Sequence, residues 1–513
     1  MTPHAVKVDP EMRARRRPEG RFSAYSERVR KVLPLALLGA LAVAILVARG
    51  GSAAPGPTYN RDVAPILDAK CASCHRLGGI APFALTTAAE AKAHAAGIVR
   101  MTKAGLMPPW MPADDSAAIV GRDVRRLTPA ELSTLARWAA GGAPAGNASD
   151  RHSTPARPAA LSGPGRTITV APHKAYVPHA TGGGIDDYHC FVLDPKLKQD
   201  AFVTGALIRP QRTGIVHHVI LYEAAGAQAT AATQMNAASG GKGWTCFGGP
   251  GLPFDLTGSS ALTRLGQPPW IAAWVPGHTT NALPGGTGVL LHAGAKIVMQ
   301  VHYNLIAAGG PDRSSAQLRL RPATTPLTRL ETQLIAAPVE LPCPAGVSGA
   351  QCSRQKSLQD EVNKYGAEAA FVPAALLKIC NRTLADFPTA VGAGTAIGTT
   401  CDRAVTQRST IYGVAGHMHL RGRDISVVLD PGTAKEQTLL HIPAWDFHWQ
   451  DVYYLQKPVE VGPGDTIRVR CSFDNSRDNQ PVVGAKQLTP RYVLWGEGTT
   501  DEMCLAMLSV ASS

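Results

Sequence analysis

His417 and His419 stand one residue apart inside an apolar run, residues 411–422, with glycines on both sides of the pair. In a β-strand, residues i and i+2 point to the same face, so these imidazoles would lie side by side with Met418 on the opposite face. Neutral imidazole is the commonest metal ligand in proteins, and the pair therefore suggests a metal site. A strand face with two partly exposed histidines would have the same spacing, so the rest of the chain has to decide.

Further candidate ligands lie far away in the sequence: His217 and His218 in GIVHHVILYEA, His302 in KIVMQVHYNL, and Met503 in GEGTTDEMC. We define the first ligand set as His217, His218 and His302, and the second ligand set as His417, His419 and Met503. Thioether sulfur favours Cu(I), and imidazole accepts copper and zinc. No carboxylate-rich cluster competes for a hard cation, so copper is the predicted metal at both sets.

Adjacent histidines are a difficulty for the first ligand set. In a regular strand His217 and His218 face opposite sides, so a shared metal requires a β-bulge or a twisted strand end. The alternative is one buried and one solvated histidine. Met503, taken by itself, also fits ordinary core packing.

Cys71, Cys74 and His75 form a C-x-x-C-H sequence. In this motif two thiols bind haem covalently, and the adjacent histidine supplies an axial nitrogen to the iron. A disulfide or a zinc site is the alternative use of the same residues. We expect one covalently bound c-type haem.

The sixth ligand of the haem iron is expected downstream, in the proline-rich loop GLMPPWMP. Met107 is the predicted ligand, with Met101 and Met111 as rivals. A methionine in this role raises the reduction potential. Residues 58–143 resemble a monohaem cytochrome c over most of their length, which implies electron transfer.

The N-terminus has the charge pattern of an exported protein. Residues 1–31 carry nine Lys or Arg against four Asp or Glu, and residues 32–48 are uncharged and apolar. Basic residues stay on the cytoplasmic side, so the chain that follows is expected on the periplasmic side of a bacterial inner membrane. The apolar stretch lies at the short edge of a membrane span, roughly 17–25 residues, and exceeds a signal-peptide core of roughly 7–15. We predict an uncleaved membrane anchor, with secretion after cleavage near residues 52–54 as the alternative.

Composition predicts several domains. The chain has 513 residues, 51 Gly and 40 Pro, which is too long for one core and typical of turn-rich β proteins. The net charge is +13, but no basic run with interleaved aromatic residues follows the N-terminal tail, so nucleic acid is not an expected partner. Alternating runs after residue 167 predict strands, and an Ala-rich stretch before residue 143 predicts helices.

The predicted fold class is multidomain. It combines an N-terminal membrane helix, a small all-α cytochrome c domain, and two all-β sandwich (jelly-roll-like) lobes with a helical, cysteine-containing insertion. The predicted divisions are 1–57 for the basic tail and anchor, 58–143 for the cytochrome c domain, 144–166 for a linker, 167–330 for the first β lobe, and 331–513 for the second β lobe with the insertion at about 340–405.

Four motifs in this order, HHV, QVHYN, HMHLRGR and DEMC, resemble the type II copper, ascorbate-dependent monooxygenases of the dopamine β-monooxygenase and peptidylglycine α-hydroxylating monooxygenase kind. The resemblance covers residues 167–513 apart from the insertion, and DDYHC and DFHWQ also match. It implies two sandwich lobes with one copper each, facing across a solvent cleft. The first ligand set would hold the copper that stores an electron, and the second, catalytic set would hold the copper that binds O2.

The implied reaction is hydroxylation of a C–H bond in a small organic substrate. Electrons would come from an ascorbate-like reductant or another redox protein, supplied or relayed by the haem. The peptide-amidating member binds a substrate carboxylate through an arginine two residues before its paired histidines. This chain has Ala415 there, so a glycine-extended peptide is a poor substrate. Arg421 and Arg423, just after the pair, are predicted to lie in a solvated turn.

Ten cysteines are present, and removing Cys71 and Cys74 leaves eight, which spacing alone could pair in 105 ways. The resemblance suggests the pairs Cys190–Cys246 and Cys471–Cys504. For the four cysteines in or beside the insertion we guess Cys343–Cys352 and Cys380–Cys401.

The alternative function is a non-enzymatic haem or copper protein that transfers electrons or handles copper. It would use the same haem and the same β lobes. The intact second ligand set favours the enzyme. A third interpretation treats the histidines as structural and only the haem as functional.

Overall fold

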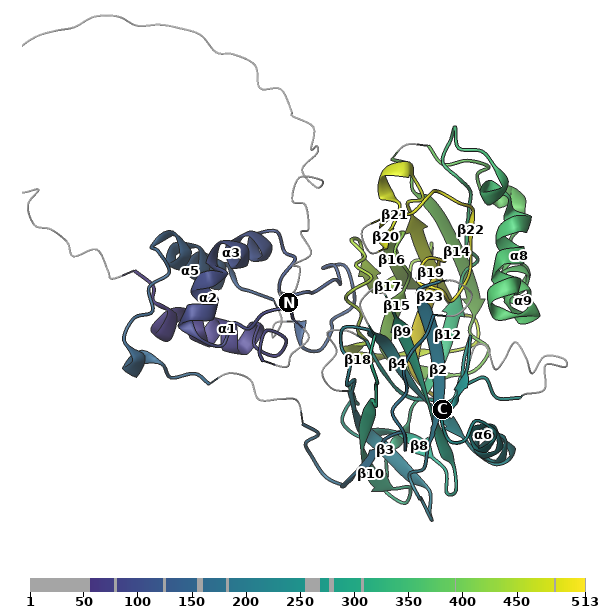
Figure 1. The fold of residues 1–513 in the computed structure, drawn as a ribbon, viewed down its shortest axis with the longest axis horizontal. Coiled ribbons are helices and arrows are strands. Elements are labelled where there is room, and N and C mark those ends of the chain that lie inside the picture. Colours follow the sequence, from purple (N-terminus) through teal and green to yellow (C-terminus); the bar gives the residue numbers. More distant parts are fainter. Residues whose placement is uncertain are drawn as a thin grey trace, which may run out of the picture. The chain divides into compact units, whose positions relative to one another are not determined.

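Strands prevail over helices in this chain (Figure 1). The computed structural model describes residues 56–77, 81–122, 126–154, 160–180, 184–253, 268–275, 281–305, 309–392, 394–483 and 486–512. By its internal contacts, Gly56–Ser513 forms one unit.

Two sheets with a common core make up the first β lobe. The first sheet has the order β1 (Arg166–Val170), β10 (Ser315–Pro322), β3 (Ala201–Arg209), β8 (Thr287–Leu291) and β11 (Thr328–Arg329), with β7 (Asn281–Ala282) beside β3. The second sheet has the order β5 (Trp244–Thr245), β2 (Asp186–Leu193), β9 (Lys296–Asn304), β4 (Val216–Ala224) and β6 (Trp270–Trp274). Val203 and Leu318 of the first sheet share one hydrophobic core with Leu221 and Met299 of the second.

Strand β9 lies at the centre of the second sheet, between β2 and β4. Its residues are buried almost without alternation, because helix α6 (Ala227–Ala238) covers the outer face of the sheet through Ala232. The disulfide Cys190–Cys246 belongs to that outer cluster. His302, a member of the first ligand set, therefore lies on a strand that is packed on both faces.

The second β lobe also has two main sheets. One has the order β12 (Glu331–Ala336), β23 (Leu505–Ser512), β15 (Ser409–His417) and β18 (Tyr453–Val461), and the other β14 (Ile397–Ala404), β19 (Thr466–Phe473), β16 (Gly422–Leu429) and β17 (Gln437–Ile442). Short strands pair as β13 (Glu340–Leu341) with β22 (Val493–Leu494) and β20 (Val482–Val483) with β21 (Lys486–Gln487). Ile411 and Leu508 of the first of these sheets pack in one core with Val427 and Val469 of the second.

A helical insertion precedes β14. It contains α8 (Arg354–Tyr365) and α9 (Phe371–Ile379), with one-turn helices at Ala350–Cys352, Ala367–Ala370 and Leu384–Asp386. Another such turn, Arg477–Asn479, follows β19. Leu376 of α9 enters the core of the second lobe, so the insertion is packed against the sheets.

The helices before residue 153 are short: a π-turn at Tyr59–Val63, α1 (Ala64–Lys70), α2 (Ala88–Ala93), α3 (Ala95–Lys103), α5 (Pro129–Ala140) and a one-turn helix at Ala148–Asp150. The capping box predicted by the sequence T-P-A-E is present at α5, where Thr128 accepts from the Glu131 amide. Leu67, Leu135 and Trp138 pack between these helices.

The predicted fold class is wrong in its N-terminal part, since a small all-α cytochrome c domain is not seen in this mostly β structure. Between α3 and α5 the chain runs along the second β lobe, where the Ala113 amide donates to His441 O (2.8 Å) and the Ala117 amide to Thr438 O (2.9 Å). Ile119 enters the core of that lobe. The Ala-rich sequence encodes local helix preference, but this middle segment packs with the strands instead of closing a helical domain.

The predicted N-terminal membrane helix is also not borne out. No helix in the described ranges is long and apolar enough to cross a bilayer. Residues 32–48, on which that prediction rested, lie outside the described residues.

Candidate metal centre

The first ligand set lies on two neighbouring strands, β4 and β9. The register shifts between Val216, which pairs with Tyr303, and His218, which pairs with His302, so His217 is the extra residue of a β-bulge. A bulge breaks the alternation that would send His217 and His218 to opposite faces. One ring nitrogen from each of the three histidines lies within 4.8 Å of the others.

Hydrogen bonding leaves the Nδ1 atom of His302 available for a metal. Its Nε2 lies 2.9 Å from Oδ1 of Asp186, which can only accept, so Nε2 carries the proton. Its Nδ1 is buried and has no partner among the described residues. The Nδ1 atoms of His217 and His218 approach each other to 3.4 Å. Such converging imidazole nitrogens fit a bound metal cation better than a core of satisfied histidines.

The protonation state of this set suits metal binding. Burial lowers the pKa of His217 and of His218 well below the usual range, and the neighbouring His302 adds to both shifts. The Tyr188 ring stacks on His302 with centroids 4.0 Å apart and so fixes its plane. The imidazoles of His217 and His218 are therefore neutral near pH 7, which is the form that binds a metal.

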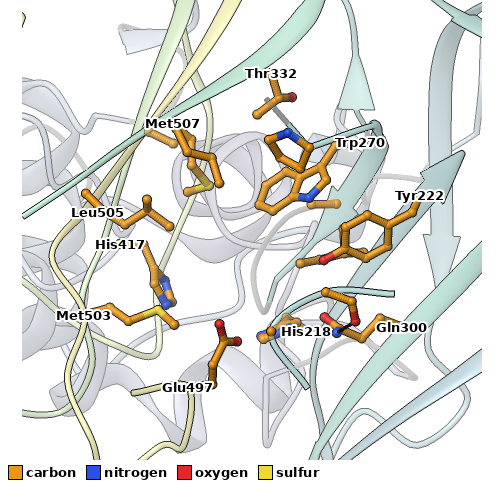
Figure 2. A pocket seen from close by; sticks show the side chains of 18 of the residues that line it. His218, Tyr222, Trp270, Gln300, Thr332, His417, Glu497, Met503, Leu505 and Met507 are labelled. Carbon is orange, nitrogen blue, oxygen red and sulfur yellow. Dashed lines mark hydrogen bonds between the residues drawn. The ribbon is translucent and has the colours of Figure 1, made fainter. Parts of the chain in front are cut away.

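The second ligand set lies where β15 meets β23. His417 is the last residue of β15 and pairs with Leu505, the first residue of β23. The His419 ring follows, with its centroid 5.1 Å from that of His417. Figure 2 shows the sulfur of Met503 beside the His417 ring, at the edge of the same cavity.

In the second ligand set the hydrogen bonds leave Nε2 of His417 and His419 available, whereas His302 of the first set keeps Nδ1 available. His417 Nδ1 lies 2.6 Å from Gln450 Oε1, and His419 Nδ1 lies 3.3 Å from the Asp501 carbonyl oxygen. Gln450 Nε2 donates to the Phe447 carbonyl at 3.0 Å, which fixes the orientation of its amide. Both histidines thus carry the proton on Nδ1 and keep Nε2 for a metal. Burial lowers the pKa of His417 to about 4 and that of His419 well below its usual range.

A buried arginine supports the loop that carries Met503. The Glu502 carboxylate accepts from the amides of His419 and Arg421, and the Arg421 guanidinium donates to the Thr500 carbonyl at 2.8 Å. The same guanidinium donates to Asn475, and the side chain is fully buried. The prediction that Arg421 lies in a solvated turn is therefore wrong, because its partners are distant in the sequence.

A cavity of about 980 Å³ opens beside both ligand sets (Figure 2). It is lined by His218 of the first set and by all three residues of the second. Its walls are mainly apolar and include Trp270, Trp274, Ile335, Leu376, Leu505 and Met507. Ala415, two residues before His417, also lines the cavity, and its methyl side chain offers no positive charge to a substrate carboxylate.

Glu497 is one of the charged residues of the cavity lining that the sequence did not single out. Its side chain points into the cavity (Figure 2). Its backbone carbonyl accepts a hydrogen bond from the Tyr188 hydroxyl. No group in the described ranges donates a hydrogen bond to its carboxylate. Burial raises the pKa of Glu497 to about 7, with the charge of Asp501 adding to the shift.

The C-x-x-C-H residues lie directly after α1. Cys71 and Cys74 are free thiols, and His75 Nδ1 lies 3.2 Å from the Phe83 carbonyl oxygen, which leaves Nε2 open. Met107 is 37% exposed in the loop after α3, whereas its rival Met111 packs against the core of the second β lobe.

The structure has four disulfides, and their pairs are those expected from the sequence. They are Cys190–Cys246, Cys343–Cys352, Cys380–Cys401 and Cys471–Cys504. The last of them involves Cys504, the residue next to Met503, so it restrains the backbone beside that side chain.

Comparison with known proteins points to one family for part of the chain. Residues 393–510 match the family model described as copper type II ascorbate-dependent monooxygenase, C-terminal domain. A stretch of 98 residues, 19% of this chain, is 28% identical to putative DBH-like monooxygenase protein 2 of Homo sapiens and spans only 17% of that protein. These matches show that the second β lobe is similar to the C-terminal domain of the copper type II monooxygenases.

Likeness to solved structures is weak. N-glycanase F aligns with a TM-score of 0.25 and 8% identity, covering 68% of this chain and 96% of that one. The VP2 subviral particle of infectious bursal disease virus aligns with a TM-score of 0.15 and 7% identity over 70% of this chain and 74% of that one. Scores this low carry no argument about fold or function.

Proposed function

We propose that the chain is a copper-dependent monooxygenase that uses O2 to hydroxylate a C–H bond of a small organic molecule. The observation that carries the proposal is the pair of ligand sets that border one cavity. The balanced reaction consumes substrate, O2, two electrons and two protons, and gives the alcohol and water. The match of residues 393–510 to the copper monooxygenase model supports it.

The residues of both sets fit copper. The first set offers imidazole nitrogens that include a buried, unpartnered Nδ1, and the second offers two imidazole nitrogens with a thioether. Imidazole binds copper in either redox state, and thioether favours Cu(I). Copper bound there supplies one-electron transfer and the reduction of O2. We assign electron storage to His217, His218 and His302, and the O2 site to the second ligand set.

The other residues prepare these ligands and the cavity. Asp186 holds the proton of His302 on Nε2, and Gln450 holds the proton of His417 on Nδ1, so each ring presents one defined nitrogen. The apolar walls favour an uncharged, largely apolar part of the substrate next to the second ligand set. They also exclude water from the reacting C–H bond.

We further propose that Cys71, Cys74 and His75 attach a haem covalently, with Met107 as the sixth iron ligand. In support, these two thiols are outside the four disulfides, and the His75 ring is oriented by Phe83 with Nε2 open. The haem would relay electrons from an ascorbate-like reductant or another redox protein. Four disulfides favour an oxidising location, which in a bacterium is the periplasm. A pyridine haemochrome spectrum of the wild type and of Cys71→Ser tests the haem separately from the copper.

Copper counting with product analysis tests the main proposal. We expect two coppers per chain in the wild type, one in His417→Ala, and one in Met503→Ala with no turnover. With ascorbate as reductant and ethylbenzene, cyclohexene and cyclohexane as probe substrates, oxygen uptake should match the formation of alcohol. Two bound coppers that ascorbate reduces without any alcohol from the three probes would instead indicate the non-enzymatic copper or electron-transfer protein.

A further inference from the structure

One loop, residues 445–450 between β17 and β18, contacts three of the six proposed ligands. Trp445 Nε1 donates to the His419 carbonyl at 3.2 Å, and Gln450 binds His417 Nδ1 at 2.6 Å. Phe447 packs on His217 of the other lobe. These three loop residues are buried, with exposures of 5–9%. A loop with this many contacts to ligands positions the metal centre instead of merely linking two strands.

Phe447 lies between the two ligand sets. Its ring stacks on His217 with centroids 4.4 Å apart and an angle of 16°. The same ring meets His419 edge to face, with centroids 5.7 Å apart and an angle of 83°. His217 belongs to the first β lobe and His419 to the second, so one aromatic ring contacts a proposed ligand of each set. Aromatic pairs at these distances are favourable in both geometries.

A second bridge joins the same two sets through hydrogen bonds. Asp186, which orients His302, also accepts from the Thr499 hydroxyl at 2.6 Å and from the Thr499 amide at 3.1 Å. Thr499 lies four residues before Met503. Both bridges are buried and cross from one lobe to the other, so the ligand sets cannot move independently.

We infer that Phe447 is a positioning residue that couples the two ligand sets, so that copper bound at one set changes the affinity of the other. When a metal binds, an imidazole rotates to direct its nitrogen, and His217 can rotate only if the stacked Phe447 ring follows. The same ring forms a T-shaped contact with His419, so the His419 ring shifts with it. The inference rests on the copper sites of the proposed function but not on hydroxylation.

The coupling is measurable as a ratio of binding constants. Cu(I) affinities are determined by competition with bicinchoninate for the wild type, for His302→Ala, which retains only the second set, and for His417→Ala, which retains only the first. The overall two-copper constant of the wild type divided by the product of the two single-set constants gives the coupling factor. We expect this factor to differ from one by about fivefold or more.

Substitutions of Phe447 test whether its aromatic ring is responsible for the coupling. In Phe447→Leu the factor should fall to within about twofold of one, while Phe447→Tyr, which keeps the ring, should retain it. Phe447→Met keeps the bulk without the ring and serves if the leucine variant does not fold. Phe387→Leu, at an equally buried phenylalanine of the insertion, is the matched control and should leave the factor unchanged.

Three results would overturn either the inference on Phe447 or the proposed function. A wild-type factor of one overturns the inference, as does a factor that persists in Phe447→Leu or Phe447→Met. Absence of copper binding to the wild type would instead refute the proposed function itself, so the two failures are distinguishable.

Discussion

Asp186→Asn is the change whose consequence follows most directly from the hydrogen bonds. The Asp186 carboxylate accepts from His302 Nε2 at 2.9 Å through Oδ1, and from Thr499 through both oxygens. Burial alone would raise the pKa of Asp186, but the bonds from His302 and Thr499 outweigh it and hold the pKa below its usual range. The wild-type side chain is thus an ionised acceptor near neutral pH.

An asparagine at position 186 has one acceptor and one donor end. If its oxygen faced His302, its NH2 group would oppose the Thr499 amide, donor against donor. The reverse orientation satisfies the Thr499 amide and hydroxyl, but then the NH2 group donates to His302 Nε2. The proton of His302 must move to Nδ1, the atom that the first ligand set needs for a metal. We therefore expect Asp186→Asn to fold and to bind copper at the first set 10–100-fold more weakly, about 1.4–2.7 kcal/mol.

The assay is a Cu(I) competition titration on a His417→Ala background, where only the first set binds. Asp187→Asn is the matched control. Asp187 is the next residue in the chain and is also buried, but its carboxylate accepts hydrogen bonds from the Tyr176 hydroxyl and the His179 amide. Wild-type affinity in Asp186→Asn, or an equal loss in Asp187→Asn, would refute the argument that Asp186 fixes the His302 tautomer.

Three further changes probe other parts of the centre. Gln450→Leu removes the acceptor on Nδ1 of His417, so the second set should bind copper about tenfold more weakly in a Cu(I) titration of a chain whose first set is disabled. Arg421→Met leaves buried acceptors without donors and should lower the free energy of unfolding in urea by about 3–5 kcal/mol. Because burial raises the pKa of Glu497 to about 7, the folded chain holds that proton more tightly than the unfolded chain, and ionisation destabilises the fold as pH rises from about 4.5 to 7. Metal-free Glu497→Gln should therefore be more stable than the wild type at pH 8 by about 3 kcal/mol, and equally stable at pH 4, in urea titrations at each pH.

Each of these has its own control. Gln456→Leu, on the neighbouring strand β18, should leave copper affinity unchanged. Arg423→Met changes a side chain that is 41% exposed and should lower the free energy of unfolding by less than about 1 kcal/mol. A stability difference between Glu497→Gln and the wild type that is the same at pH 4 and pH 8 would show that the carboxyl charge is not its cause.

The sequence pointed to the residues of the two proposed ligand sets but not to the groups that hydrogen-bond to them. Paired histidines and strand alternation are local features, and they placed His217 and His302 on strands that turn out to be neighbours. The sequence indicated only that a metal shared by His217 and His218 would require a bulge or a twisted strand end; it did not show that the bulge is present. Contacts such as Asp186 with Thr499, 313 residues apart, depend on how the lobes meet and leave no local pattern.

The N-terminal part of the predicted fold class was wrong for a related physical reason. Alanine content and capping boxes report that a segment prefers helix, and the helices are there. Whether they close into a domain depends on residues 113–120, whose amides bond to strands more than 300 residues away. Arg421 illustrates the same limit, since a charged residue in a turn-like sequence is buried by partners that only the folded chain supplies.

Residues 113–120 also limit how far the chain can be shortened from its N-terminus. They cover the edge of the second β lobe, where Ile119 is 2% exposed and Asp115 pairs with His441 at 2.8 Å. A shortened chain starting at Arg166 would uncover that edge and the apolar side chains beneath it, a surface prone to pair with other molecules. Residues 113–120 therefore cannot be removed together with the N-terminal helices without exposing that edge of the second β lobe to association with other molecules.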